Sequence, residues 1–332
     1  MRATIGQIAY HLPEAILNNE ELEQLYDNFP AGKIFAKTGI SERRIAAEDE
    51  TASDLAAKAA EKLFAQDPQL KEQIDGILMC TQTPDFLLPT TACLLQERLG
   101  LSPDVAAFDI NLGCSGFVYG LGIAKGMIET GQATKILLLT ADTYSKLIDP
   151  EDRSVRSLFG DAAAATIVEA TDSSEEFIGP FVYGTDGSGA DQLITRIGGM
   201  RERIESEAGE SKYPWLQMRG PEIFQFSIEC VPDCVEKLEA RAGIDRDDVD
   251  LFVFHQANGF MLEHLRQKLK IDHERFYVHM ESCGNTVSST IPIALLEAEK
   301  QGALRDGMKV MLVGFGVGLS LGCAMIQWNS NG

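Results

Sequence analysis

The residue whose type and setting most suggest chemistry is Cys114, in the segment DINLGCSGFVYGLG at 109–122. It follows a strand-like run and a glycine turn, and an apolar, helix-like segment comes after it. A thiol at a buried helix N-terminus meets unpaired N–H groups and the positive end of the helix dipole, which favour the thiolate. Gly113 and Gly116 allow a substrate to approach closely. We predict that Cys114 is a nucleophile; the alternative is the buried apolar role of most free cysteines.

Two residues of the second half of the chain could support such a nucleophile. His255 ends the apolar run VDLFVFH within the motif HQAN, and Asn285 lies in SCGNTVSST. A buried imidazole needs a partner or a role, and it changes charge near neutral pH. The alternatives are a structural role for His255 and an ordinary helix N-cap for Asn285.

The glycine-dense segment GFGVGLSLG at 314–322 follows another apolar run. No GK[ST] signature follows it, so a phosphate-binding loop is the weaker interpretation. We expect a tight turn whose backbone N–H groups form an oxyanion hole together with the amide of Cys114.

The two halves of the chain repeat the same order of patterns. Apolar strand, helix, strand, helix and strand follow one another at 74–142, and again at 249–316. Such alternation predicts an α/β fold with parallel sheet covered by helices. We expect an N-terminal half at 1–172 and a C-terminal half at 173–332 to pack about a pseudo-two-fold axis. Ligands bind at the carboxyl ends of strands, so the nucleophile of the first half would meet the histidine and asparagine of the second. The polar stretch at 200–212 predicts an exposed loop or short helix.

Composition narrows the class of protein. The 332 residues carry a net charge of −21, which disfavours nucleic acid and anionic membranes as partners. No apolar run is long enough to span a membrane and no signal peptide is visible, so we expect a cytoplasmic protein. Cys230 and Cys234 are spaced four apart without a second pair, a poor metal site. We expect no metal and no redox cofactor.

Taken together, the motifs DINLGCSGF, HQAN, GNT and GFGxG, in this order, resemble the β-ketoacyl-acyl-carrier-protein synthase III family of the thiolase-like superfamily. The segments TGISERRIA at 38–46 and DPEDRSVRSLFGDAAAA at 149–165 also fit. The resemblance implies a duplicated five-layer αβαβα fold and a homodimer.

The resemblance also implies a reaction. Cys114 would take an acyl group from acyl-CoA, and a malonyl thioester would then lose CO2. His255 and Asn285 would stabilise the resulting enolate, while the backbone amides of Cys114 and Val317 would hold the tetrahedral oxyanion. The enolate would attack the acyl-cysteine to give a β-ketoacyl product.

The same resemblance assigns substrate-binding residues, and some depart from the family pattern. Lys37 is the basic residue before TGI, Arg153 would flank the CoA adenine, and Asn258 closes the HQAN motif. Lys33 stands where the family often has a tryptophan that stacks on the adenine, so that stacking is expected to be lost, although Lys33 could reach a CoA phosphate. Phe260 replaces an arginine that docks the carrier protein.

Three basic residues of the following segment, Arg266, Lys268 and Lys270, could replace the lost arginine; the alternative is a solvated helix face. Leu88 stands where the family often has a phenylalanine that crosses the dimer interface and limits the acyl pocket. The smaller leucine predicts that primers longer than acetyl are accepted.

Other functions remain open from the sequence. A thiolase-like acyltransferase to an oxygen, nitrogen or sulfur nucleophile would need Cys114 but not the full pair of donors. Condensation of a secondary-metabolite starter, and a degenerate structural partner of a larger complex, are further alternatives. The sequence is consistent with either CoA or acyl carrier protein as the carrier of the malonyl group.

Overall fold

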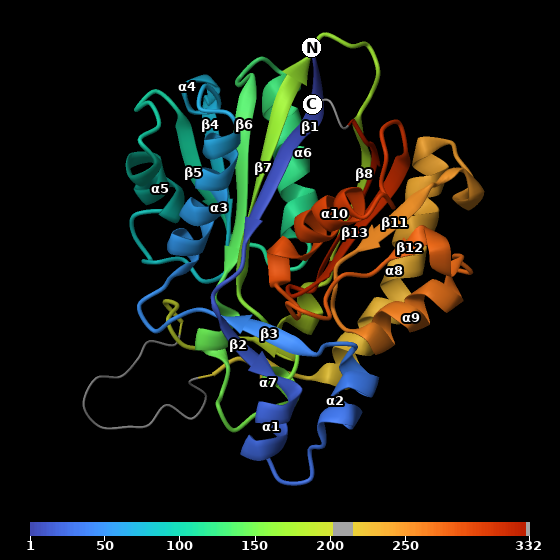
Figure 1. Ribbon diagram of the computed structural model, residues 1–332. Helices are drawn as coiled ribbons and strands as arrows, with labels where there is room; N and C mark the ends of the chain where they lie inside the picture. Colours follow the sequence, from blue (N-terminus) through green and yellow to red (C-terminus); the bar gives the residue numbers. More distant parts are fainter. Residues whose placement is uncertain (202–214, 330–332) are drawn as a thin grey trace.

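The protein is built on two five-stranded sheets, shown in Figure 1. The computed structural model describes residues 1–201 and 215–329. In the first sheet the strand order is β1-β7-β6-β4-β5, with β4 parallel to β5 and β6, and β7 antiparallel to both β6 and β1. Its strands are β1 (Arg2–His11), β4 (Gly76–Cys80), β5 (Ala106–Ile110), β6 (Lys135–Asp142) and β7 (Ala162–Thr171).

The second sheet repeats the first. Its order is β12-β11-β13-β14-β8, with β11 parallel to β12 and β13, and β14 antiparallel to both β13 and β8. The strands are β8 (Ile178–Thr185), β11 (Leu251–Phe254), β12 (Phe276–Tyr277), β13 (Lys309–Gly316) and β14 (Ser320–Gln327). Read from the other edge, the order matches strand for strand, as the repeated sequence patterns predict.

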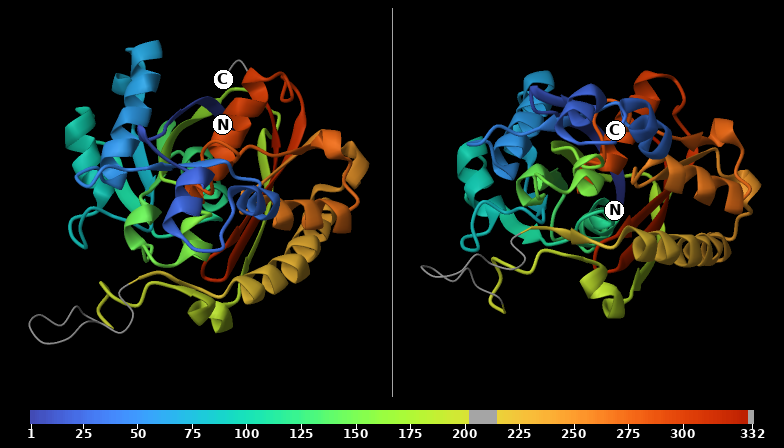
Figure 2. Two further views of the ribbon diagram at one scale, coloured as in Figure 1. Left: turned by 60° about the horizontal axis from the view of Figure 1, so that its bottom comes forward. Right: turned by 90° about the horizontal axis from the view of Figure 1, so that it is seen from below.

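Helices separate and cover the two sheets, which gives five layers (Figures 1 and 2). In the middle layer, α6 contacts strands of both sheets, and α10 contacts β1, β7 and β11. On the outer faces, α3 and α5 cover the first sheet, while α8 and α9 lie on the outer side of the second sheet. These helices are α3 (Ala52–Gln66), α5 (Thr91–Leu99), α6 (Gly116–Glu129), α8 (Gly220–Ala242), α9 (Gly259–Lys268) and α10 (Thr290–Lys300). The predicted α/β class and the five-layer fold are confirmed.

Small residues allow α6 to lie between the sheets. A Cβ added to Gly120 would approach Leu138 Cδ1 to 2.7 Å, and one added to Gly122 would overlap the hydroxyl of Tyr183. A larger residue at either position would therefore force the neighbouring side chain to move, so the glycines permit this close packing. The packing fixes the N-terminal end of α6, where Cys114 lies, relative to the second sheet.

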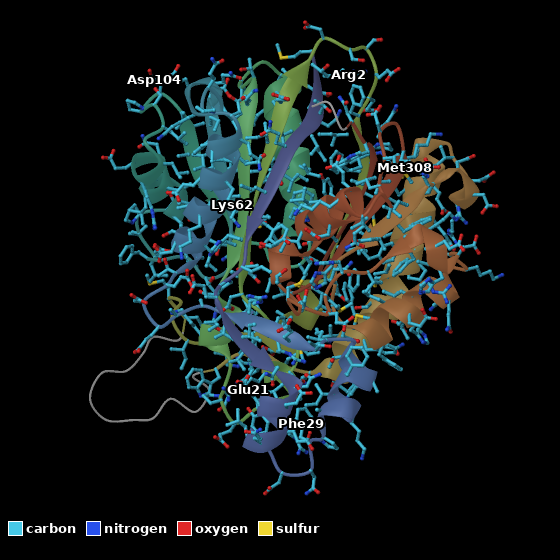
Figure 3. All side chains as sticks on the ribbon, viewed as in Figure 1. Arg2, Glu21, Phe29, Lys62, Asp104 and Met308 are labelled. Carbon is cyan, nitrogen blue, oxygen red and sulfur yellow. The ribbon has the colours of Figure 1, made fainter. Side chains whose placement is uncertain are left out.

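A smaller group of elements covers one end of both sheets, the lower end in Figure 1. There the two-stranded antiparallel sheet of β2 and β3, together with α1, α2 and α7, lies next to the first turns of α8 and α9, and Phe29 marks this end in Figure 3. The remaining elements are β2 (Ala15–Asn18), α1 (Asn19–Leu25), α2 (Ala31–Thr38), β3 (Glu42–Ile45), α4 (Leu70–Gln73), α7 (Arg153–Arg156), β9 (Leu193–Ile194) and β10 (Gln217–Met218).

Most of the predicted elements form where the patterns place them, with one clear difference. The second strand of the repeated pattern at 249–316 is shorter than its counterpart before Cys114, because β12 ends at Tyr277. The N–H of His279 donates to Gln256 Oε1 at 2.7 Å instead of extending the ladder. The chain therefore turns away from the sheet and carries Asn285 toward the first half. The expected loop at 200–212 lies almost wholly outside the described residues.

Candidate active site

A cavity of about 1000 Å³ opens at the end of the molecule covered by α2 and α7. Cys114, His255 and Asn285 all line it. The first follows β5 of one sheet, the second follows β11 of the other, and the third lies in the turn before α10. The structure therefore brings together the thiol, imidazole and carboxamide that the sequence singles out, from both halves of the chain.

Cys114 lies in the turn between β5 and α6, two residues before the helix begins. Its side chain is buried, and burial raises the pKa of the thiol to about 12. The backbone N–H groups of Val317 and of Cys114 itself face the sulfur and oppose this shift. Both amides favour the thiolate, as expected near a helix N-terminus, but removal from water has the larger effect on the pKa of the thiol.

Two glycines at the end of β13 permit the contact with Cys114. A Cβ on Gly314 would lie 2.7 Å from the Cα of Ser115, and one on Gly316 would lie 2.8 Å from Cys114 Sγ. The hydroxyls of Ser115 and Ser320 join the two turns at 2.7 Å. This turn presents the N–H of Val317 to the sulfur, as the sequence predicts for a donor of an oxyanion hole.

His255 is held from both its backbone and its ring. Its N–H donates to the carbonyl of Val313 at 2.7 Å, and its Nδ1 lies 2.8 Å from Thr290 Oγ1. Burial lowers the pKa of the imidazole to about 3, while the nearby carbonyl of Val287 acts in the opposite direction. The ring is therefore neutral near pH 7.

The carboxamide of Asn285 has a fixed orientation. Its Oδ1 accepts from the N–H of Val287 at 3.0 Å, so Nδ2 points the other way. That nitrogen donates to the carbonyl of Ala257 at 3.3 Å and lies 3.5 Å from Nε2 of His255. The helix-cap interpretation does not describe this residue, because α10 begins only at Thr290.

The mouth of the cavity is basic and aromatic. Lys33, Lys37 and Arg153 line it, and both lysines are exposed. The guanidinium of Arg153 lies over the ring of Phe29, 5.4 Å from its centroid, and donates to the carbonyl of Asp27 at 2.9 Å. The sequence analysis missed Phe29, because its contact with Arg153 spans more than a hundred residues.

Three assigned residues have other settings. Asn258 lines the cavity but also caps α9, since its Oδ1 accepts from Met261 N at 2.9 Å. Leu88 lies outside the cavity of the single chain and is 85% exposed. Phe260 is exposed at the mouth and packs with Phe224.

Two of the three basic residues that could replace an arginine at position 260 already have partners within the chain. Arg266 pairs with Glu263 at 2.7 Å, and Lys268 donates to the carbonyl of Ile228 at 2.5 Å. Both interactions lie within the chain, which favours the solvated-face alternative for these two side chains.

A buried carboxyl that the sequence analysis missed links the two halves behind the site. Asp142 Oδ1 accepts from the N–H of Gln82 at 2.8 Å, and Oδ2 accepts from the hydroxyl of Ser288 at 2.6 Å. Burial raises its pKa to about 7. Its position at the end of the apolar run KILLLTAD could have indicated a buried carboxyl near the site.

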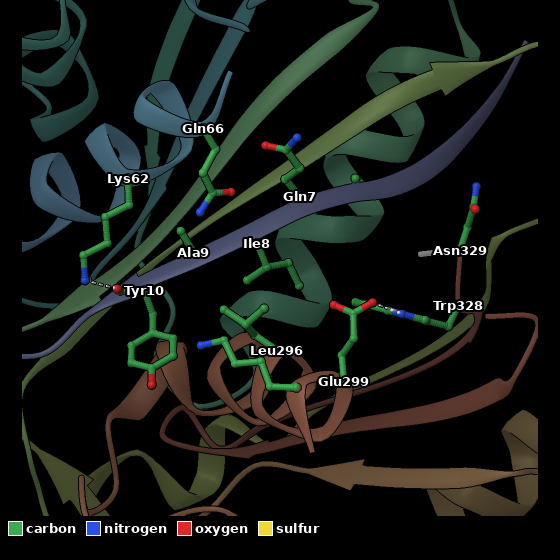
Figure 4. A pocket seen from close by; sticks show the side chains of 12 residues that line it. Gln7, Ile8, Ala9, Tyr10, Lys62, Gln66, Leu296, Glu299, Trp328 and Asn329 are labelled. Atoms are coloured by element: carbon green, nitrogen blue, oxygen red, sulfur yellow. Dashed lines mark hydrogen bonds between the residues drawn. The ribbon is translucent and has the colours of Figure 1, made fainter. Parts of the chain in front are cut away.

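A second cavity, of about 400 Å³, lies between β1, α3 and α10 (Figure 4). Lys62 Nζ donates there to the carbonyl of Tyr10 at 2.7 Å. Its lining contains neither cysteine nor histidine. Among residues 1–201 and 215–329 we find no cluster of metal-binding side chains and no helix that could cross a membrane.

Comparison with known proteins identifies the family of the chain. The family model described as 3-oxoacyl-[acyl-carrier-protein (ACP)] synthase III matches residues 108–187, and the model of its C-terminal part matches 240–328. The chain is 38% identical over 320 residues to the β-ketoacyl-[acyl-carrier-protein] synthase III of Caldanaerobacter subterraneus, covering 96% of each.

Solved structures give the same result. A crystal structure of a 3-oxoacyl-(acyl-carrier-protein) synthase III is 52% identical, with a TM-score of 0.95 over 99% of this chain and all of that one. The priming β-ketosynthase of the R1128 polyketide pathway is 27% identical, with a TM-score of 0.90 over 100% of this chain and 97% of the other. This chain belongs to the 3-oxoacyl-acyl-carrier-protein synthase III family of acyltransferases, which confirms the family and enzyme class predicted from its motifs.

Proposed function

We propose that the protein transfers an acyl group from acyl-CoA to Cys114 and condenses it with a malonyl thioester, releasing CO2 and giving a β-ketoacyl product. One observation carries this proposal: a buried thiol shares a cavity with a neutral imidazole and an oriented carboxamide. Covalent catalysis uses the thiol, and stabilisation of an enolate uses the other two groups.

In the first half-reaction the sulfur attacks the thioester carbonyl. The oxygen becomes an oxyanion, which the N–H groups of Val317 and Cys114 are placed to receive. CoA leaves and takes the proton that the thiol loses. Because the resting thiol has a raised pKa, this proton is released only as the new bond forms.

In the second half-reaction the malonyl thioester loses CO2, and its carbonyl oxygen gains negative charge. Asn285 Nδ2 and His255 Nε2, 3.5 Å apart, can both face that oxygen. Two donors in a dry cavity stabilise the enolate, whose carbon attacks the acyl-cysteine. The carbon–carbon bond forms, and the sulfur leaves as a thiolate that takes up a proton.

The mouth of the cavity suits the nucleotide part of CoA. The Phe29 ring and the Arg153 guanidinium offer two planar surfaces for the adenine. Lys33 and Lys37 are four residues apart on α2, and neither side-chain ammonium group has a hydrogen-bond or ion-pair partner in the described part of the chain. Both side chains are free to bind phosphates. Phe29 supplies the stacking surface that was expected to be lost at position 33.

The proposed homodimer would form at the β5 edge of the first sheet. β5 is an edge strand, paired on one side with β4, and such edges pair with other strands. Asp109 on β5 accepts from the N–H groups of Thr91 and Ala92, which holds the preceding loop beside the edge. In that loop Phe86, Leu87 and Leu88 are 59%, 67% and 85% exposed. A second copy would cover them, and Leu88 would then approach the partner's acyl pocket.

The remaining assignments are carried as proposals. The boundary between the halves at 1–172 and 173–332 falls in the connection between β7 and β8. The expected location of the protein is the cytoplasm. Malonyl-CoA and malonyl carrier protein are both candidate donors of the malonyl group. The similarity to a polyketide priming enzyme keeps a secondary-metabolite starter as the second candidate function.

Partial reactions test the proposal. Purified protein is incubated with radiolabelled acyl-CoA and, separately, with malonyl thioester carrying labelled carboxylate. Cys114→Ala should abolish the protein-bound label, and Asn285→Ala should retain it while losing CO2 release and condensation. A wild-type protein that acylates but never releases CO2 would support simple acyl transfer instead. Label retained by Cys114→Ala would show that another residue is the nucleophile.

A further inference from the structure

The ring of His255 has two nitrogens with different tasks. Nε2 faces Asn285, and Nδ1 faces the hydroxyl of Thr290 at 2.8 Å. A neutral imidazole carries its proton on one nitrogen only, and the partner of the other nitrogen decides which one. The partner of Nδ1 therefore controls what Nε2 can do in the cavity.

Thr290 has a second partner that competes for its single proton. Its hydroxyl lies 3.0 Å from the carbonyl of Val287, in the turn Val287–Ser289. A carbonyl can only accept, so a Thr290 hydroxyl that donates to Val287 must accept from Nδ1. In this first arrangement the proton is on Nδ1, and Nε2 can only accept.

The first arrangement gives His255, Thr290 and Asn285 a partner each. Nδ1–H donates to Thr290, Thr290 donates to Val287, and Asn285 Nδ2 faces the lone pair of Nε2 at 3.5 Å. Stabilisation of an enolate, however, needs a proton on Nε2. If Nε2 carried the proton, Nε2–H and Asn285 Nδ2–H would lie about 3.5 Å apart, and an oxygen placed between them would accept from both.

We infer that Thr290 is the positioning residue that selects the tautomer of His255: its hydroxyl rotates from the carbonyl of Val287 to Nδ1 when a thioester oxygen occupies the site. The inference rests on the proposed condensation. In this second arrangement Thr290 donates to Nδ1, and Nε2–H and Asn285 Nδ2–H both donate to the thioester oxygen. Nε2 takes up a proton from solvent in the cavity and Nδ1 releases one to solvent, so the imidazole stays neutral and no proton is gained or lost overall.

Formation of an imidazolium is not an alternative route to a donor at Nε2 near pH 7. Burial of the ring lowers its pKa to about 3, so the doubly protonated form is rare. The hydroxyl of Thr290 is the group within 3 Å of Nδ1 that can donate to it. Without that hydroxyl the carbonyl of Val287 faces the ring as an acceptor, which holds the proton on Nδ1.

Thr290→Val tests the inference, because it keeps the shape of the side chain and removes the hydroxyl. We expect acylation of Cys114 to remain within about twofold, while CO2 release from malonyl-CoA and condensation fall about 10²-fold or more, the usual loss of one donor to an oxyanion. Thr290→Ser should restore both. Thr286→Val is the matched control: Thr286 is buried in the same turn, and its hydroxyl has no partner within the described structure.

The outcomes separate the inference from the proposed function. Wild-type protein without CO2 release would overturn the condensation itself. Normal CO2 release by Thr290→Val, or equal losses in the serine and valine variants, would overturn only the role of Thr290. Nitrogen-15 NMR of the wild-type imidazole, assigned by comparison with His255→Gln, gives a readout that survives poor folding of any Thr290 variant. It should show Nδ1–H in the free enzyme and Nε2–H with a malonyl-CoA analogue that cannot lose CO2. The same tautomer in both states would refute the switch.

Discussion

Gly316 lies against the sulfur of Cys114: a Cβ built on the glycine would come within 2.8 Å of Sγ and 2.9 Å of the cysteine Cβ. Its φ of +154° is also one that side chains rarely adopt. The two residues come from different sheets, so the second half of the chain forms the wall of the pocket that holds the nucleophile.

Gly316→Ala should therefore impair acylation more than folding. The added methyl must displace either the thiol or the turn that carries the N–H of Val317. We expect acylation to fall at least tenfold, as measured by label from acyl-CoA. Gly187→Ala is a control, because nothing lies within 4 Å of its added Cβ. Equal effects of the two changes would argue against a close contact at the sulfur.

The buried His255 should make the protein sensitive to acid. Its pKa is about 3 in the folded protein against 6.5 for an ordinary histidine, so the unfolded chain binds one more proton between these values. The free energy of unfolding should fall as pH drops below 6.5, with this residue contributing at most about 1.4 kcal/mol per pH unit. Urea unfolding of wild type and His255→Gln between pH 7 and 4 measures the difference. Parallel curves would contradict the neutral, buried ring.

Phe29 should contribute to binding of the nucleotide rather than to chemistry. Phe29→Ala removes the ring under Arg153 and should raise KM for acyl-CoA about tenfold, with kcat little changed. Acyl-pantetheine, which lacks the nucleotide, should show no such penalty. Phe35→Ala is the control, since Phe35 is exposed on α2 but does not line the cavity. An equal rise in KM for both substrates would place the effect elsewhere.

Leu88 should set the length of the primer through the proposed dimer. Leu88→Phe should restrict the enzyme toward acetyl-CoA, while wild type accepts longer acyl groups. The ratio of kcat/KM values across an acyl-CoA series measures this, and sedimentation shows whether the dimer persists. A strict acetyl preference of the wild type would refute the primer prediction. An unchanged ratio in the variant would place Leu88 outside the acyl pocket.

The sequence by itself determined the duplicated architecture and the three reactive groups. Apolar runs at strand and helix spacing are local properties, so β6, β13 and α10 form close to where the patterns place them. The motifs around Cys114, His255 and Asn285 are also contiguous, and they identify the family before any coordinates.

Only the tertiary structure decided the protonation states and the partners of these groups. Backbone amides favour the thiolate of Cys114, as the sequence suggests, but burial between two sheets has the larger effect and raises the pKa of the thiol. Phe29 meets Arg153, and Thr290 meets His255, across long stretches of chain. Solvent exclusion and hydrogen-bond geometry depend on what packs from elsewhere in the chain, and a one-dimensional pattern does not contain that information.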